Sequence, residues 1–212
     1  MNHINKKEIN HEDRRLLATY DDTTIRIYQA YNKRIADEAL ELGRFGKSFK
    51  VDRMTWIKPS FLWMMYRSGW GTKVDQERIL AIDIMREGFE HIILNAVLST
   101  YNERVYSTYN EWKDKLSVSQ VRCQWDPDRD IYGNAIERRA IQLGIKGLMV
   151  NKYVNEWIKK ITDITEDVRV LREARNNKAI DVNTLPNEKE YFVDDNIKDI
   201  LGMRLEDDLE WT

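Results

Sequence analysis

The chain has 212 residues, of which 42% are hydrophobic and 33% charged, with a formal net charge of −2 at pH 7. This length and composition fit one compact domain with a substantial core. The single cysteine, Cys123, excludes an intramolecular disulfide and a zinc site built on several thiolates. Because His91 is the only histidine beyond residue 11, a histidine-rich metal centre or a Ser-His-Asp triad is not expected.

Charge is distributed unevenly along the chain. Residues 181–212 carry ten acidic and three basic side chains, so the rest of the chain is net basic. We expect a polar N-terminal arm or helix over 1–19, one domain over 20–180 and an acidic, solvated tail over 181–212. No apolar run is long enough to span a bilayer and no signal peptide is present, which predicts a cytoplasmic location and no membrane partner.

The first third of the chain predicts two strand–helix pairs. The β-branched run 24–30 suits a strand, and Asn32 is placed to cap a helix that ends at Gly43. A short strand follows over 54–57, and Pro59 is predicted to begin the next helix.

The rest of the chain predicts shorter and less regular elements, and residues 101–117 fit either a helix or an extended segment. The short, unevenly spaced strands favour a single mixed α+β domain, with a small twisted sheet flanked by helices. The predicted elements are strands at 78–84 and 118–125, a loop at 126–135, a short segment at 136–143, and helices at 89–97, 153–161 and 165–176.

An arginine lies inside the first predicted strand, in the run Arg26-Ile-Tyr-Gln-Ala-Tyr31. Arg26 and Tyr28 share one face of such a strand, and Gln29 lies on the other. Arg26 needs an anionic partner, because burying an isolated charge is costly. That partner is either an internal acid such as Asp83 or a phosphate of a ligand.

Residues 53–70 combine three tryptophans with cations and hydroxyl groups. Aromatic faces and cations are what a pocket for a planar, anionic ligand requires. Lys58 and Ser60 flank Pro59 at a helix start, where free backbone N–H groups favour an anion. The alternative is a tryptophan-rich core segment whose cations extend to solvent. The candidate binding residues of this segment are Trp56, Lys58, Ser60, Trp63 and Arg67.

Three aspartates alternate after a predicted strand, at Asp126, Asp128 and Asp130. The spacing is that of the first calcium ligands of an EF-hand loop, but the central glycine is missing and Pro127 interrupts the run. A turn stabilised by aspartate-to-backbone hydrogen bonds is therefore favoured over a metal site. Asp126 directly follows a predicted strand, a position where catalytic acids are often found.

The runs Arg26-Ile-Tyr-Gln-Ala-Tyr31, Arg53–Trp70 and Gln124-Trp-Asp-Pro-Asp-Arg-Asp130 are long and specific. They resemble the domain of unknown function 4291 family, over roughly residues 15–190. The family name implies no established activity.

The order of motifs also resembles that of ADP-ribosyltransferases. Those folds open with a strand that carries arginine or histidine and continue with a helix and a strand bearing serine or threonine. The resemblance implies NAD as the cofactor, Arg26 in the first motif, and Thr55 or Ser60 in the second. The late strand offers Gln124 and Asp126 and no glutamate, so these two and Arg26 are the implied catalytic residues. The implied NAD-binding residues are Tyr28, Gln29, Tyr31, Thr55, Trp56, Lys58, Ser60, Trp63 and Arg67.

Three functions remain open, and we favour the first. A nucleotide-dependent transferase, using NAD and a nucleic-acid or protein acceptor, predicts that residues 26, 58 and 126 line one cleft. A nucleic-acid-binding or RNA-processing module predicts an open basic, aromatic groove over 24–74. A structural or interaction domain predicts that the three tryptophans are core and that Arg26 is paired internally.

Overall fold

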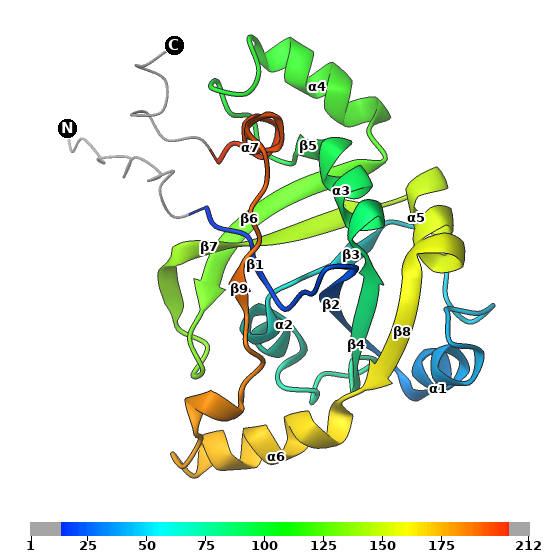
Figure 1. Cartoon of the computed structure of the whole chain (residues 1–212), viewed down its shortest axis with the longest axis vertical. Helices are drawn as coiled ribbons and strands as arrows, with labels where there is room; N and C mark the ends of the chain where they lie inside the picture. The colour runs from blue at the N-terminus through cyan, green and yellow to red at the C-terminus, as the bar shows by residue number, and fades with distance from the viewer. Residues whose placement is uncertain (1–13, 204–212) are drawn as a thin grey trace.

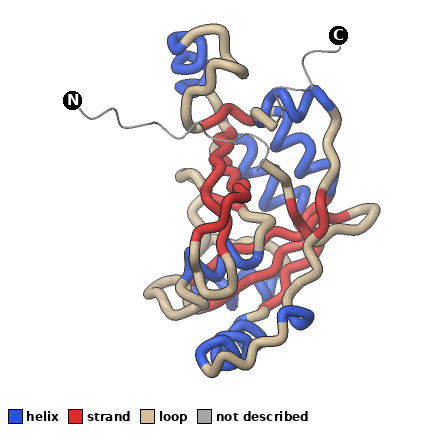
Figure 2. The backbone as a smooth tube through the Cα atoms, turned by 90° about the vertical axis from the view of Figure 1, so that its left-hand side faces the viewer, coloured by secondary structure: helices blue, strands red, loops and turns tan. Residues whose placement is uncertain are grey.

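The computed structural model describes residues 14–203, and the architecture below refers to that range. It is a mixed α and β structure, as expected, but its strands form three small sheets instead of one (Figures 1 and 2). The first sheet is antiparallel, in the order β2–β4–β8, and the second has the order β3–β7–β6–β5. The strands of the first sheet are β2 (Thr24–Tyr31), β4 (Arg78–Met85) and β8 (Ile158–Asp163). The strands of the second sheet are β3 (Thr55–Ile57), β7 (Ala135–Ile145), β6 (Val121–Arg129) and β5 (Ala96–Leu98).

The two larger sheets meet where β2 lies beside the end of β3. The Tyr28 N–H donates to the Lys58 carbonyl at 2.7 Å, an isolated bridge between the sheets. The Gln29 side chain adds a second link, donating from Nε2 to the Trp56 carbonyl at 3.0 Å. Residues paired across two strands project to the same side, so Tyr28 and Lys58 share one face.

Local signals placed the first two helices correctly. The Asn32 side chain accepts from the Ile35 N–H at the start of α1 (Lys33–Leu42), which ends at left-handed Gly43. Helix α2 (Phe61–Ser68) begins two residues later than the predicted start at Pro59, because Ser60 is its cap. Helix α2 contacts both β2 and β6 and so lies across the junction of the two sheets (Figure 1).

The predicted helix over 89–97 is wrong at its end. Helix α3 (Arg86–Leu94) stops before Asn95, and the next residues form β5, which pairs in parallel with β6. The undecided segment 101–117 contains α4 (Tyr109–Val118), capped by the Thr108 side chain.

The loop predicted to begin at Asp126 is a strand. Strand β6 continues to Arg129 and pairs with β7, so only 130–134 form the turn between them. Pro127 is tolerated because it lies past the end of β5, where β6 has β7 on one side only. The segment 136–143, which was not assigned a strand, lies within β7.

The predicted helix over 153–161 is wrong from residue 158 onward. A helix runs through α5 (Leu148–Lys152) and a π-helical turn (Tyr153–Trp157), and the chain then enters β8. Pairing of β8 with β4 outweighs the helical spacing of the apolar residues. Helix α6 (Thr165–Asn176) follows, with the predicted bounds.

The expected solvated tail is part of the folded body over residues 181–203. A 3₁₀ turn (Val182–Thr184) leads to β9 (Lys189–Glu190), which pairs with β1 (Leu17–Ala18), and then to α7 (Asp195–Leu201). Strand β1 lies in the predicted N-terminal arm, so the arm joins the fold there as well. The rest of the two predicted ends, 1–13 and 204–212, lies outside the described residues. The buried side chains of the C-terminal segment are Tyr191, Ile197 and Leu201.

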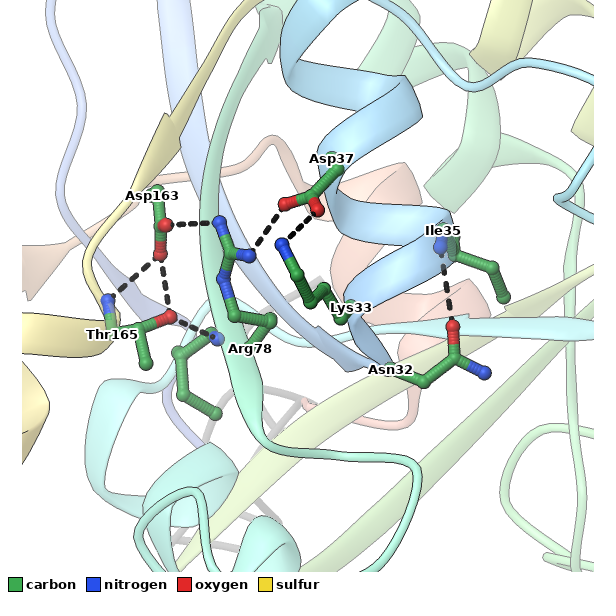
Figure 3. Close-up of polar contacts among 8 residues, drawn as sticks. Asn32, Lys33, Ile35, Asp37, Arg78, Asp163 and Thr165 are labelled. Atoms are coloured by element: carbon green, nitrogen blue, oxygen red, sulfur yellow. Dashed lines mark hydrogen bonds and ion pairs between the residues drawn. The ribbon is translucent and has the colours of Figure 1, made fainter.

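Arg78, the first residue of β4, connects this strand to α1 and β8 (Figure 3). Its guanidinium pairs with Asp37 on α1 and with Asp163 at the end of β8, each at 2.5 Å. The Asp163 carboxylate also accepts from the N–H and hydroxyl of Thr165, the first residue of α6. This network fixes the positions of α1 and α6 against β4.

Apolar side chains fill the space between the sheets and helices. Ile27, Ile82 and Leu143 are fully buried in one cluster, and Phe61, Met65 and Trp70 belong to a second around α2. Within residues 14–203 no helix is long and apolar enough to cross a membrane.

Candidate functional site

One face of the second sheet is lined with polar and charged side chains. Along β6, Val121 and Cys123 point into the core, so Gln124 and Asp126 point to the opposite side. Opposite Gln124, β7 contributes Gln142 from the same side. We call this surface the polar face, and its members are Lys58, Arg122, Gln124, Asp126, Asp128, Arg138 and Gln142.

Two amide side chains hold the Asp126 carboxylate in place. Gln124 Nε2 donates to Oδ1 at 2.8 Å, and Gln142 Nε2 donates to Oδ2. Gln124 and Asp126 were both candidates for a contact with the ribose, and the structure joins their side chains by this hydrogen bond. Gln142 was missed, because its place opposite Gln124 depends on the strand register, which the sequence alone does not specify.

Lys58 is a buried cation without a carboxylate partner. The residue is only 5% exposed, and its ammonium lies 5.1 Å from the centre of the Trp63 ring. Within residues 14–203, its ammonium has neither a hydrogen-bond acceptor nor an ion pair. Burial and, to a smaller extent, the Arg67 charge lower the pKa of Lys58, the Asp126 charge opposes them, and the net pKa is about 8. An anion bound beside Lys58 would be attracted by a positive charge that has no ion pair with the described residues.

Beside Lys58, an ion pair between a buried carboxylate and a partly exposed arginine supports the start of α2. Asp128 is 3% exposed, and its Oδ2 accepts from Arg138 Nε at 2.9 Å and Nη2 at 2.6 Å. Its Oδ1 accepts from the Ser60 hydroxyl at 3.3 Å, and Ser60 Oγ in turn accepts from the Trp63 N–H. Asp128 is therefore occupied within the protein, and Ser60 has the role of a helix cap.

The expectation that a phosphate binds the N-terminus of α2 is not supported, because an internal carboxylate already lies there. Glu188 Oε1 accepts from the Phe61 N–H at 2.6 Å. Burial raises the pKa of Glu188, the Phe61 hydrogen bond and the Arg138 charge lower it, the Asp128 charge raises it, and the net pKa is about 8. Glu188 had been assigned to the solvated tail, so no local signal could have placed it at this helix.

Glu188 makes stability depend on pH. Because its pKa rises from 4.5 to about 8 on folding, the folded protein between these values holds a proton that the unfolded chain has released. The free energy of unfolding should therefore fall by roughly 3 kcal/mol between pH 5 and 8, with allowance for partial exposure of the residue. Glu188→Gln should flatten this decline in urea unfolding, with Glu190→Gln as the control. An equal decline in wild type and Glu188→Gln would contradict the assignment.

Arg26 lies apart from the polar face and has an internal partner. Its Nε and Nη2 donate to the two oxygens of Asp83 at 2.8 and 2.9 Å, which is the internal alternative considered for this residue. Tyr28 packs edge-on against Phe61, with ring centres 5.4 Å apart. Arg26 and Tyr28 line a separate cavity to which neither Lys58 nor Asp126 contributes, so residues 26, 58 and 126 do not line one cleft there.

Three further predicted residues form a buried network at the junction of the sheets. Gln29 Nε2 donates to Thr55 Oγ1 at 3.1 Å, and its Oε1 accepts from the Tyr153 hydroxyl at 2.7 Å. The Tyr31 hydroxyl lies 3.3 Å from Thr55 Oγ1. These contacts hold β2 against β3 and occupy the polar groups of Gln29, Tyr31 and Thr55.

The tryptophans of the predicted pocket divide between core and surface. Trp63 and Trp70 are 7% and 4% exposed, as the structural alternative requires. Trp56 is partly exposed, and its ring lies over Gly144 so closely that a Cβ there would come within 3.0 Å. Arg67, on α2, is exposed. Trp56 and Arg67 therefore remain accessible to a ligand at the edge of the polar face.

The acidic side chains near the turn at 130–134 are used within the protein. Asp130 accepts from the backbone N–H groups of Tyr132 and Asn134, as the favoured turn requires. Across residues 14–203, no three acidic, histidine or cysteine side chains are grouped closely enough to hold a metal ion.

Comparison with known proteins gives a family without a known activity. The model of a family described as a domain of unknown function, DUF4291, matches residues 15–191. This range covers β1 to β9 and so includes the polar face and the cavity beside Arg26. No curated protein matches the chain.

Proposed function

This chain belongs to the domain of unknown function 4291 family, whose description names no activity, and we propose from its site that it binds a nucleotide through Lys58. The proposed ligand is NAD, and the proposed reaction is that of an ADP-ribosyltransferase-like enzyme. The ligand lies on the polar face, with its diphosphate at Lys58 and its reacting ribose toward Asp126.

The observation that carries this proposal is Lys58, a residue only 5% exposed whose ammonium has no ion pair with the residues that the structure describes. A cation in such a position costs free energy unless an anion accompanies it, and the described residues supply none within ion-pair distance. Lys58 and Arg67 together would neutralise a diphosphate. Trp56, partly exposed at the edge of the same face, would offer a ring on which a base can stack.

The structure changes the roles that the sequence suggested for the other residues. Arg26 is neutralised by Asp83, so the proposed diphosphate site rests on Lys58 and not on Arg26. Gln124 becomes a positioning residue, because it holds Asp126 from one side as Gln142 does from the other. The order of a strand with arginine, a helix, a second strand and a late strand bearing Asp126 supports the ADP-ribosyltransferase-like interpretation.

The proposed transfer exchanges one bond at the ribose C1′ atom for another. The bond between C1′ and the nicotinamide nitrogen breaks, and nicotinamide leaves with the bonding electron pair. A nucleophilic atom of the acceptor forms the new bond to C1′ and releases its proton to solvent or a base. The fixed Asp126 carboxylate would stabilise the positive charge that develops on the ribose between these events.

Calorimetric titration of NAD into the purified protein tests the proposal. We expect saturable binding that Lys58→Met weakens by at least about tenfold, as loss of a charged contact to phosphate requires. Lys33→Met is the matched control, because Lys33 lies on α1 with its side chain 81% exposed. Wild-type protein should also release nicotinamide from NAD, and Asp126→Asn should slow that release with little change in affinity.

Two outcomes would contradict the proposal. One is no heat of binding up to millimolar NAD and ADP-ribose. The other is binding that Lys58→Met leaves unchanged. Salt-dependent binding of single-stranded RNA in place of NAD would favour the nucleic-acid alternative.

A further inference from the structure

A cavity of about 490 Å³ lies between α2, α6 and the first sheet, and Phe61 lines it whereas Lys58 does not. This volume is within the range of small-molecule pockets. Most of its wall is apolar, from side chains of α2, β4 and α6. The lining residues include Arg26, Tyr28, Phe61, Ala81, Leu171 and Asn187.

The guanidinium of Arg26 is the polar group that distinguishes this cavity. Two of its three nitrogens are bonded to Asp83, whereas Nη1 has no hydrogen bond to any residue in 14–203. The Arg26 side chain is 33% exposed, so Nη1 is open to a molecule in the cavity. It can therefore donate one hydrogen bond to a ligand.

The charges around the cavity disfavour an anion. Asp83 cancels the charge of Arg26, and Asp167 adds a carboxylate to the cavity lining. An anionic ligand would meet these carboxyl groups without an unpaired cation, whereas a neutral acceptor can use the Arg26 donor at no such cost.

We propose that this cavity is a second binding site, for a neutral molecule with a ring-sized apolar body and one hydrogen-bond acceptor. The apolar body lies against Phe61, Ala81 and Leu171, and the acceptor receives a hydrogen bond from Arg26 Nη1. This second site is separate from the proposed nucleotide site at Lys58. It does not depend on that proposal, because no residue is used in the argument for both sites.

Two probe molecules with the same number of non-hydrogen atoms test the charge preference. Propiophenone is neutral and carries a carbonyl acceptor, and phenylacetate is an anion. Ligand-observed NMR should show propiophenone bound at least about tenfold more tightly than phenylacetate. Ala81→Leu should weaken propiophenone binding, because Ala81 lines the cavity from the same face of β4 as Asp83 and a larger side chain there would fill it. Ala179→Leu, on the exposed surface after α6, is the control and should bind as wild type does.

Asp83→Asn should change the preference between the two probes in the opposite direction. It keeps the shape of the side chain and leaves Arg26 unneutralised, so the preference should shift toward phenylacetate. The proposal is overturned if neither probe binds at ten-millimolar concentration, as an order of magnitude for weak fragments. It is also overturned if Ala81→Leu has no effect, or if Asp83→Asn leaves the preference unchanged. None of these measurements uses a nucleotide, so their failure is distinguishable from failure of the Lys58 site.

Discussion

Replacing Lys58 by methionine should raise the free energy of unfolding by about 3 kcal/mol at pH 7. The physical reason is that folding lowers the pKa of Lys58 from 10.5 to about 8, so a charged Lys58 is a cost to the folded state. Methionine retains the apolar chain beneath Trp63 and removes that charge. A gain in stability together with a loss of NAD binding would show that Lys58 serves ligand binding at a cost to stability.

The pH dependence gives the same prediction an independent check. Between about pH 8 and 10.5 the unfolded chain still binds the proton that folded Lys58 has lost, so stability should rise with pH in that window. In Lys58→Met this rise should be absent, which thermal unfolding of the two proteins in matched buffers can measure. Equal or lower stability of Lys58→Met at pH 7 would contradict the expected cost of the charge.

Replacing Arg138 by methionine should destabilise the protein by about 3 to 5 kcal/mol, the largest loss expected from a single change at the site. Asp128 is 3% exposed, and Arg138 is its only cationic partner among residues 14–203. The substitution leaves the carboxylate buried with only the Ser60 hydroxyl and the Arg129 N–H as donors. Urea unfolding at pH 7 measures the loss.

A double substitution separates the lost ion pair from lost packing. Asp128→Asn in the Arg138→Met background removes the unpaired charge and should recover a large part of the stability. If the double variant is as unstable as Arg138→Met, the cost comes from packing and the interpretation of the pair is wrong. The matched surface control is Arg169→Met, because its pairs with Glu166 and Glu173 are exposed and should matter little.

Local signals in the sequence were sufficient to predict an element whose two ends are set by residues next to it in the chain. Asn32 and Gly43 end α1 through a side-chain cap and a left-handed residue, both of which depend only on neighbouring backbone. The sequence also predicted that Arg26 lies in a strand and that Asp83 is one of its two candidate partners. The strand follows from the alternation of residue types along the chain, and the need for a partner follows from the cost of burying an unpaired charge.

Features that depend on pairing between distant segments could not be predicted. Residues 158–163 have helical spacing but form β8, because β4 offers them an edge. Gln142 reaches Asp126 only through the register of β6 and β7. Glu188 reaches the start of α2 from 127 residues further along the chain, and so fills a site that the sequence suggested for phosphate. Of the three residues expected to line one cleft, Lys58 and Asp126 lie on the polar face, whereas Arg26 lies apart from it beside Asp83.

The most direct test of the nucleotide site is the pKa of Lys58 itself, with and without ADP-ribose. NMR of protein with carbon-13 at lysine Cε follows the ionisation of each lysine, and Lys58→Met identifies the signal of interest. In the free protein Lys58 should titrate with a pKa near 8, well below the ordinary lysine value of 10.5. A bound diphosphate favours the charged ammonium, so ADP-ribose should raise that pKa. A Lys58 titration that saturating ADP-ribose leaves unchanged would contradict the proposal that this residue holds the phosphates of a nucleotide.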